Sequence, residues 1–329
     1  MSFKDIKSYL LGPGLQKLIA VGSLVVLYIF FAIFGTHFLS SDTLVSILDS
    51  SYYIGFIAIG MTFVIITGGI DLSCGTVMVG SALIGGVAYN VWHIHIVATL
   101  LIVLLSATAF GLCNGLLVGK LHLPPFIATL GMQFISLGIC SVVAKVQTQT
   151  YPSLNSPDGW FKQAVYKVNG FPIGIVWLIV FFCIGWILLN KTVLGRYTYA
   201  IGSNEEAVEL SGIKTDNWKI LVYVVNGVFA GFAGIIYAAT FSTITPQTGN
   251  GQEMYAIAAC VIGGTSLSGG IGSLSGTIIG VFVIFCLKGG AFVNGTSGAM
   301  AKCFDRSCSI ACGTCGCNQN EENQKVESK

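Results

Sequence analysis

The feature that most constrains this fold is a series of long apolar stretches that contain almost no charged side chains. The stretches cover residues 18–38, 51–67, 75–91, 94–119, 127–145, 171–189, 218–239, 254–264 and 271–287. A helix needs about 20 apolar residues to cross a bilayer. Inside lipid, only helices and closed barrels satisfy all their backbone hydrogen bonds internally. The pattern therefore predicts an all-α, polytopic membrane helical bundle with about nine spans.

The composition excludes a soluble globular protein. Only 9% of the 329 residues are charged, and the mean hydropathy is +0.80. Soluble domains carry about 25% charged residues, so this chain has too few charges to keep a soluble surface hydrated. The 42 glycines suit helices that pack closely in lipid, and the spacing of Gly227 and Gly231 predicts one such close contact.

Basic residues predict how the chain is oriented in the membrane. Lys4, Lys7 and Lys17 precede the first apolar stretch, which favours a cytoplasmic N-terminal segment over residues 1–17. That stretch is long for a signal peptide and no A-x-A-like cleavage site follows it, so we interpret it as a retained span. The membrane domain is then expected to cover residues 18–288.

A charged segment at residues 197–217 is too polar to cross the membrane and is predicted to form the main cytoplasmic loop. Within it, Asn204 is placed to cap a short helix, and Gly212 is placed to end it. The apolar residues of this helix are expected on one face and the acids on the other; they are Ala207, Val208, Leu210 and Ile213, and Glu205, Glu206 and Glu209. Helices that lie on membranes prefer basic polar faces, so the acidic face favours docking to a protein partner.

Two glycine-rich sequences resemble each other at distant places in the chain. GGIDLSCG at residues 68–75 and GGTSLSGG at residues 263–270 share the pattern G-G-x-x-L-S-x-G. Transporters often contain broken helices in related halves, although glycine-rich hairpins also look alike by composition alone. Both interpretations stay open at this point.

Asp71 is the acidic residue that we expect deepest in the apolar part of the chain. A carboxylate at bilayer depth costs about 2.5–3.5 kcal/mol on insertion scales, so it usually has a partner or a function. It is either a contact for a substrate or ion, or the cap of a helix that begins there, and we favour the cap.

Several chemistries have no supporting motif. The chain contains no P-loop, no H-E-x-x-H zinc motif and no G-x-S-x-G nucleophile motif. We therefore expect no enzyme activity, no cofactor, no metal site and no nucleic-acid partner. A permease that is powered by a separate protein fits best. The alternative is a stand-alone secondary transporter of a small polar solute, and neighbouring genes for an ATPase and a binding protein would discriminate between the two.

Four motifs carry a family likeness: GMTFVIITGGIDLSCG at residues 60–75, LPPFIATLGM at 123–132, GRYTYAIGSNEEAVELSGI at 195–213 and YAIAACVIGGTSLSGGIGSLSGTIIG at 255–280. Over about residues 18–288 the chain resembles bacterial ribose/xylose/galactose-type ABC sugar permeases, within the branched-chain amino acid/sugar permease superfamily. The motifs stand in the family's order, which makes the resemblance specific.

The resemblance implies a type II-like ABC permease that works as a dimer with a second permease subunit, each with about ten spans. It also implies a separate ABC ATPase on the cytoplasmic side and an extracytoplasmic sugar-binding protein, with the permease in the cell (inner) membrane. The ATPase-coupling helix then comprises Asn204, Glu205, Glu206, Ala207, Leu210, Ser211 and Gly212. Candidate residues of the translocation path, from the family motifs, are Asp71, Thr129 and Gly131.

The C-terminal residues 289–329 depart from the family pattern and are rich in cysteine. Zinc sites usually separate their cysteine pairs by a longer stretch, so the spacing of Cys308, Cys312, Cys315 and Cys317 is poor for metal. Disulfides or a disordered tail are a second interpretation. The third is a translation that is one base out of frame.

We favour the out-of-frame interpretation. Shifting the frame by one base turns Met300-Ala301 into tryptophan without any choice of codon. A consistent choice elsewhere gives a loop, an apolar stretch of roughly 15 residues and a basic end, which resembles a last span with a cytoplasmic terminus. The tail cysteines are therefore given no functional role.

Overall fold

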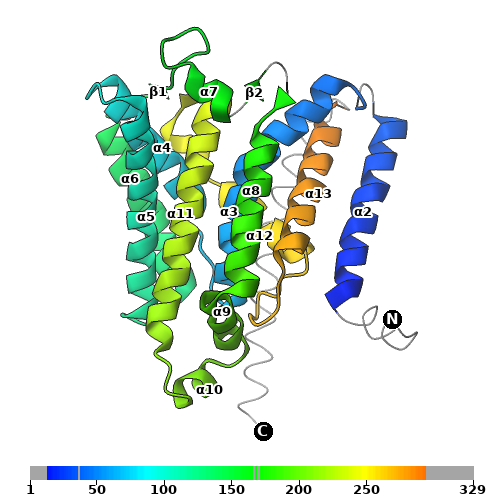
Figure 1. Cartoon of the computed structure of the whole chain (residues 1–329), viewed down its shortest axis with the longest axis vertical. Helices are drawn as coiled ribbons and strands as arrows, with labels where there is room; N and C mark the ends of the chain where they lie inside the picture. Colours follow the sequence, from blue (N-terminus) through cyan, green and yellow to red (C-terminus); the bar gives the residue numbers. More distant parts are fainter. Residues whose placement is uncertain (1–12, 36–37, 166, 169–170, 294–329) are drawn as a thin grey trace.

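The computed structural model describes residues 13–35, 38–165, 167–168 and 171–293, and these form an elongated bundle of helices (Figure 1). The helices are α2 (Pro13–Phe34), α3 (Ser41–Ile66), α4 (Cys74–Asn90), α5 (Ile96–Gly119), α6 (Pro125–Val143), α7 (Trp160–Val165), α8 (Gly174–Lys191), α9 (Val193–Ser203), α10 (Glu205–Leu210), α11 (Thr215–Phe241), α12 (Gln252–Ile262) and α13 (Leu274–Val293). Lys4, Lys7 and the cysteine-rich sequence from residue 294 onward lie outside the described residues.

The predicted all-α membrane class is confirmed, but the count of about nine spans is not. Within the described residues, 5 helices are long and apolar enough to cross a bilayer. Shorter apolar helices cover Leu18–Phe34, Cys74–Asn90 and Leu274–Gly290. Helix α12 has 11 residues and rises about 16 Å, which is about half of the hydrocarbon thickness. Each predicted apolar stretch does contain a helix, and α12 enters the bundle without being able to cross it.

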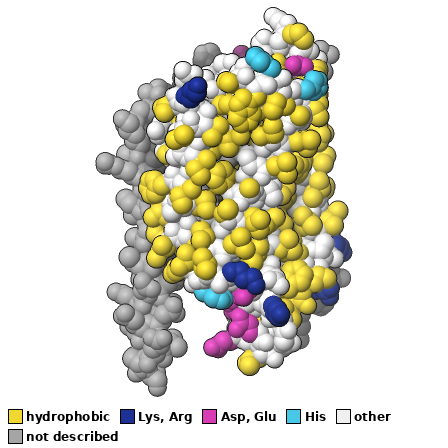
Figure 2. All heavy atoms as spheres, turned by 90° about the vertical axis from the view of Figure 1, so that its left-hand side faces the viewer, with side chains coloured by type: hydrophobic (Ala, Val, Ile, Leu, Met, Phe, Trp, Pro, Cys, Tyr) yellow, Lys and Arg dark blue, Asp and Glu magenta, His cyan; other side chains and the backbone are white. Residues whose placement is uncertain are grey.

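Charged side chains gather at the two ends of the molecule. Figure 2 shows one face on which hydrophobic side chains cover the region between those ends. Leu105 of α5 and Phe134 of α6, for example, are 67% and 66% exposed. Apolar side chains with this exposure are stable in hydrocarbon, which is consistent with a belt that faces lipid.

Helix α3 forms the centre of the bundle. Every residue from Ser51 to Ile66 is buried, and α8, α11, α12 and α13 pack against the helix. A helix that is apolar on all sides is stable only when it is enclosed by other helices or by lipid. Helices α5 and α11 run side by side, where a Cβ on Gly111 would lie 2.9 Å from the Cα of Gly227. The close contact predicted from the glycine spacing is therefore confirmed at Gly227.

The two ends of the bundle differ. At one end, β1 (Gln149–Thr150) pairs with β4 (Thr243–Ile244), and β2 (Lys167–Val168) pairs with β3 (Phe171–Pro172). Close to β4, the Lys162 ammonium donates a hydrogen bond to the Ser242 hydroxyl, and burial lowers the pKa of Lys162. The opposite end carries α9 and α10 (Figure 1). We call these the strand end and the α10 end.

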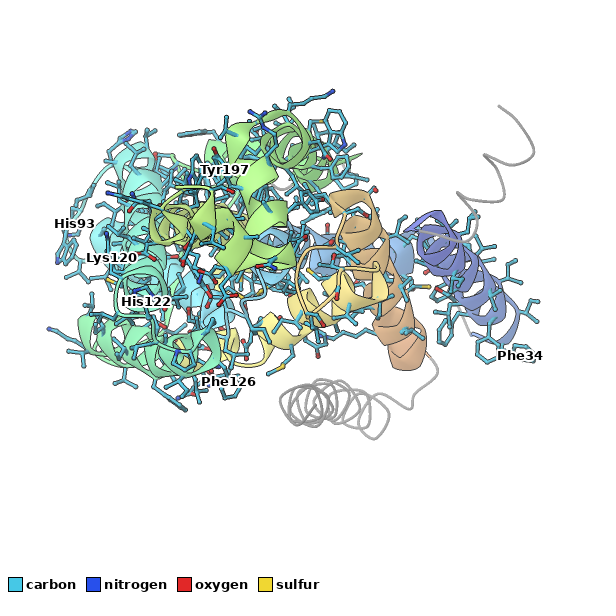
Figure 3. The ribbon with its side chains drawn as sticks, turned by 90° about the horizontal axis from the view of Figure 1, so that it is seen from below. Phe34, His93, Lys120, His122, Phe126 and Tyr197 are labelled. Atoms are coloured by element: carbon cyan, nitrogen blue, oxygen red, sulfur yellow. The ribbon has the colours of Figure 1, made fainter. Side chains whose placement is uncertain are left out.

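Helix α2 lies at the edge of the bundle, on the far side from α5 and α6 (Figures 1 and 3). Its contacts with the remaining helices are mostly to α13. A small apolar cluster joins the two helices and includes Phe31, Phe38 and Cys286.

The segment 197–217, expected as a loop, is helical for most of its length. It contains the end of α9, all of α10 and the first turn of α11. Helix α9 is amphipathic: Leu194, Thr198 and Ile201 are buried at a spacing of three or four residues, while other positions face outward. Because α9 ends at Ser203 and α10 begins at Glu205, the two helices are directly connected.

Candidate functional site

The short helix α10 is defined by its two ends. The Asn204 side chain accepts a hydrogen bond from the Ala207 N–H at 2.9 Å, as an N-cap residue does. At the other end, the Gly212 N–H donates to the Glu209 carbonyl at 2.8 Å, and Gly212 has a φ of 81°. Glycine adopts this left-handed conformation without the steric penalty of a Cβ. The predicted cap and stop signals are confirmed.

One face of α10 is held against the protein. Thr215 donates its hydroxyl to Glu205 at 3.1 Å and to Glu209 at 2.6 Å. The Lys219 ammonium lies 2.5 Å from the Glu205 carboxylate. This ion pair is partly exposed, so it contributes about 0–1 kcal/mol to stability. Val208 of α10 is buried on the same inward face. Together these contacts fix the orientation of α10.

The other face of α10 is exposed among the described residues. Glu206, Ala207 and Leu210 are exposed, and the exposed fraction of Leu210 is 89%. Glu206 and Leu210 lie four residues apart and share this face. The pattern had predicted that Leu210 would lie on one apolar face with Val208, and this is wrong. Residues two positions apart point to different sides of a helix, so only one of them is buried.

A polar cluster is buried beside the loop that joins α3 to α4. Asp71 accepts hydrogen bonds from the Ser73 N–H at 2.8 Å and from the Ser73 hydroxyl at 2.6 Å. The Asn226 amide of α11 donates to Asp71 at 2.7 Å, and the Asn114 amide of α5 donates to the Ser73 hydroxyl at 2.7 Å. All four side chains are buried. We call them the Asp71 cluster.

The favoured interpretation of Asp71 as the cap of α4 is wrong, because the N-cap residue of this helix is Ser73. Helix α4 begins at Cys74, and Asp71 accepts the backbone N–H of Ser73, which is the N-cap residue. The Asp71 carboxylate therefore accepts a hydrogen bond within the loop before α4, not from the first turn of the helix, and it also accepts one from an amide of α11. Hydrogen bonds to the charged form reduce the free-energy penalty of burying a carboxylate.

The other two candidate path residues lie in different surroundings. The Thr129 hydroxyl donates to the Ile70 carbonyl at 3.2 Å and to the Pro125 carbonyl at 2.8 Å, so it joins α6 to the Asp71 loop. Gly131 lies on the exposed side of α6, and a Cβ there would meet no atom within 4 Å. The structure therefore brings Thr129, but not Gly131, to the loop that carries Asp71.

The sequence interpretation missed several buried polar residues. Glu253, next to the start of α12, is 2% exposed, and its carboxylate accepts a hydrogen bond from Gln133 of α6 at 3.2 Å. Asp71 is therefore not the one deeply buried acid. Asn114 and Asn226 were also missed, although an amide inside an apolar stretch is itself a signal of function or packing.

The two glycine-rich sequences meet in space, since a Cβ on Gly269 would lie 3.0 Å from the Gly68 nitrogen. The Gly270 N–H donates to the Ile66 carbonyl at 2.8 Å, which joins the loop after α12 to the end of α3. Gly202 of α9 lies against the same contact: a Cβ on Gly202 would lie 1.7 Å from the Ile66 carbonyl oxygen and 2.5 Å from the Gly270 nitrogen. No other residue type fits there. We call this contact the Gly202 junction.

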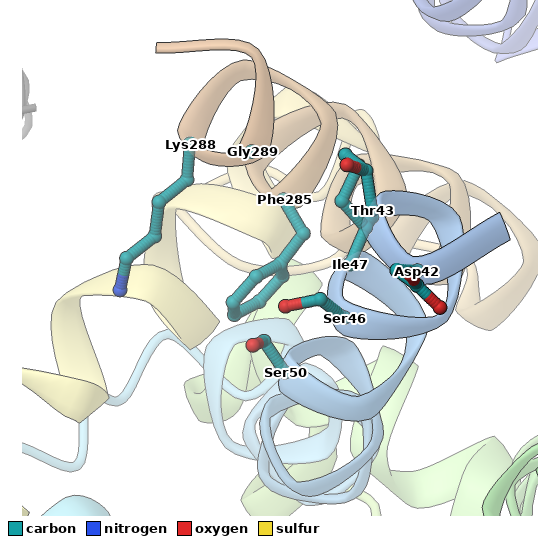
Figure 4. A pocket seen from close by; sticks show the side chains of 8 residues that line it. All are labelled: Asp42, Thr43, Ser46, Ile47, Ser50, Phe285, Lys288 and Gly289. Atoms are coloured by element: carbon teal, nitrogen blue, oxygen red, sulfur yellow. The ribbon is translucent and has the colours of Figure 1, made fainter. Parts of the chain in front are cut away.

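Cavities lie at both ends of the molecule. A cavity of about 300 Å³ at the α10 end is lined by residues that include His122, Glu205, Lys219 and Tyr223. Figure 3 views this end and labels His122 on the turn between α5 and α6. Toward the strand end, a cavity of about 600 Å³ lies between α3 and α13, where Ser46, Ser50 and Phe285 approach one another (Figure 4).

An apolar cavity of about 440 Å³ lies nearby, between α2, α3 and α13. As for metal ions, no group of three or more His, Cys, Asp or Glu residues is placed to hold one in the described ranges.

Residues 43–304 match the family model described as branched-chain amino acid transport system / permease component. The match spans most of the 329 residues. The chain belongs to this permease family.

Several curated permeases are similar along most of their length. The ribose import permease protein RbsC of Bacillus subtilis (strain 168) is 37% identical over 284 residues, which cover 86% of this chain and 87% of the relative. RbsC of Escherichia coli (strain K12) is 38% identical over 286 residues, covering 84% and 86%. The autoinducer 2 import system permease protein LsrC of Yersinia pestis (strain Pestoides F) is 34% identical over 270 residues, covering 80% and 74%. No solved structure matches this permease.

Proposed function

We propose that this chain is the membrane-spanning permease subunit of an ATP-driven importer that moves a ribose-like monosaccharide across the cell membrane. The observation that carries the proposal is the identity of 37% and 38% to two ribose import permeases across most of each chain. The bundle, with an apolar belt and charged ends, supports the membrane location. An extracytoplasmic binding protein would deliver the sugar, and a second permease subunit would complete the path.

The outward face of α10 is proposed as the surface that docks the ATPase. Glu206 and Leu210 are exposed, while Glu205 and Glu209 are engaged by Thr215. This arrangement supports a division of roles, in which the inward face anchors α10 and the outward face contacts the partner. An exposed acid beside an exposed leucine fits a partner groove that is apolar and basic at its rim.

The Gly202 junction is proposed to connect docking with the membrane helices. Helix α10 follows α9 directly, and Gly202 of α9 contacts the Ile66 carbonyl and the Gly270 nitrogen without an intervening side chain. A displacement of α10 would then move two membrane loops together, because a packed contact at this distance is not compressible. ATP must bind one state of the assembly better than the other for this displacement to drive transport.

The Asp71 cluster is proposed to position the loop before α4. The hydrogen bonds of its carboxylate come from Ser73 and from amides of α5 and α11. We therefore propose that residues other than Asp71 and Thr129 contact the sugar. Asp71 and Thr129 are proposed to hold the backbone of the loop before α4 in place.

Reconstitution tests the proposed function. The chain is placed in vesicles with its partner ATPase and binding protein, and ribose uptake is measured with and without ATP. We expect uptake that requires both partners, because the chain itself has no P-loop. Uptake that proceeds without the ATPase would contradict the importer and support a secondary transporter.

The docking surface has a separate test in pull-down of the ATPase. Changing Glu206→Ala together with Leu210→Ala should weaken capture of the ATPase by the permease, because both side chains are exposed on the outward face of α10. The matched control is Leu39→Ala together with Asp42→Ala, which removes an exposed leucine and an exposed acid at the strand end. Capture should be lost in the first variant and kept in the control. Full capture by the double variant would contradict the assignment of α10.

A further inference from the structure

The segment between β4 and α12 is rich in side-chain amides. It includes Gln247, Asn250 and Gln252, with Glu253 at the start of the helix. The segment forms a short 3-10 turn, Pro246–Gly249, and Gly251 before α12 has a φ of 85°. Glu253 is the single charged residue between 242 and 254. We call residues 245–253 the amide break.

The amide break lies deep between the two ends of the bundle. Helix α12 leads from it toward the α10 end and rises about 16 Å over 11 residues. On the other side, Gly249 packs against Gly75 at the start of α4, and α4 rises about 25 Å over 17 residues toward the strand end. Because the hydrocarbon core of a bilayer is about 30 Å thick, the break lies well inside it.

Part of the amide break is nevertheless exposed on the surface of the chain. Gln247, Asn250 and Gly251 are exposed, and Gln252 is half-buried. The Asn250 amide donates to the Gln247 side chain at 3.3 Å, which satisfies only part of their hydrogen-bonding capacity. The surrounding lipid-facing surface is different, since α5 and α6 expose Leu105 and Phe134 at comparable positions along the bundle.

Lipid is excluded as the environment of these amides. Hydrocarbon offers no hydrogen bonds, and an unsatisfied amide there costs roughly 4–8 kcal/mol relative to water. Irregular backbone at membrane depth is tolerated only when it is buried in protein or lines a water-filled cavity. The described residues leave this part of the amide break uncovered, so an aqueous path is the environment that can satisfy its amides.

The buried carboxylate of Glu253 lies behind the exposed amides and has unused hydrogen-bonding capacity. One oxygen of Glu253 accepts hydrogen bonds from the Gly251 N–H at 3.1 Å and from the Gln133 amide at 3.2 Å. The other oxygen has no hydrogen-bond partner within the described residues, and neither has the side-chain oxygen of Gln252. A built Cβ on Gly75 would lie 2.5 Å from that free Glu253 oxygen, so α4 leaves room for nothing larger than glycine there.

We infer that the amide break is the part of the translocation path that contacts the sugar. This inference rests on the proposed function and adds a site to it. Side-chain amides donate and accept hydrogen bonds without adding charge, which suits a neutral, polyhydroxylated ligand. Gln133 of α6 extends the surface on one side, and a second permease subunit would form the opposite wall.

Thiol labelling tests the inference in the assembled importer. Asn250→Cys and Gln247→Cys are each treated with a charged, membrane-impermeant methanethiosulfonate reagent, with and without ribose, and uptake by the unmodified chain is measured in parallel. The matched control is Leu105→Cys, an exposed position about 14 Å from the start of α5. The chain has its own cysteines, so the labelling of the unmodified chain is subtracted from that of each variant.

We expect the two amide positions to react at least about tenfold faster than Leu105→Cys, because a charged reagent does not enter hydrocarbon. Ribose should slow labelling at both positions. Equal rates at Asn250→Cys, Gln247→Cys and Leu105→Cys would overturn the inference. A chain that transports ribose but shows no protection by ribose would also overturn it. Absence of ATP-dependent uptake by the unmodified chain is a different outcome, since it contradicts the proposed function.

Discussion

Asp71 shows how a carboxylate is kept inside an apolar bundle. It is 3% exposed, and its partners come from its own loop, from α5 and from α11. An isolated buried charge would be costly, whereas one that accepts several hydrogen bonds is stabilised in place. The same hydrogen bonds connect the loop before α4 with α5 and α11, so Asp71 holds this loop in its position.

This role predicts the effect of Asp71→Asn. The new amide group would place hydrogen-bond donors opposite donors from Ser73 or Asn226, which leaves buried groups unpaired. We expect the free energy of unfolding to fall by about 1–3 kcal/mol. Thermal denaturation of the detergent-solubilised chain measures it, with the exposed Asp42→Asn as the control. An Asp71→Asn chain as stable as the control would show that the carboxylate is not needed for the cluster.

At the scale of elements, α9, α10 and the two glycine-rich loops form one connected unit. Gly202 is in contact with the Ile66 carbonyl, to which Gly270 donates its N–H. Helix α9 is amphipathic and packs against α8, α11 and α3 at the α10 end, so it carries α10 at a fixed place relative to these loops. Short distances between backbones transmit displacement more directly than contacts between flexible side chains do.

The Gly202 junction predicts a defect in coupling. Gly202→Ala would place a methyl group where the Ile66 oxygen and the Gly270 nitrogen lie, which forces the backbones apart. Overpacking of this kind costs about 1–3 kcal/mol. We expect ATP-driven uptake to be lost while ATPase capture by α10 is kept. The control is Gly138→Ala on α6, where a Cβ would meet no atom within 4 Å. Normal uptake by Gly202→Ala would contradict this coupling route.

At the scale of the whole molecule, each helix depends on its neighbours for burial. Helix α3 is enclosed on all sides from Ser51 to Ile66, whereas α2 and α13 lie at one edge. Packing between helices, rather than burial from water, stabilises a bundle in lipid. A helix missing from such a bundle leaves the neighbouring surfaces without a partner.

The out-of-frame interpretation of residues 289–329 makes a prediction at this scale. Sequencing the DNA across codons 285–295 in independent reads should reveal a single-base slip. A gene with the frame restored should give more protein in the membrane and more uptake, because the last helix regains its packing contacts. Quantitative immunoblots against this chain measure the first effect, with synonymous changes at the same codons as the control. Equal levels and equal uptake would refute the interpretation.

The elements were predictable because their signals are local. Charge-free stretches mark the helices, and Asn204 and Gly212 mark the ends of α10. The site was less predictable because its partners are far apart in the sequence. Asn114 lies 43 residues from Asp71, and Asn226 lies 155 residues from it. No spacing rule connects such positions, so Asp71 was recognised but its partners were not.

The sequence by itself determined a helical membrane protein, because a chain with so few charges must satisfy its backbone hydrogen bonds within helices. It also determined the caps of α10, which depend on bonds within a few residues. Only the tertiary structure decided that α12 stops inside the bundle, that the glycine-rich loops meet at Gly202, and that α10 turns Leu210 outward. These features depend on packing between distant segments, which local patterns do not encode.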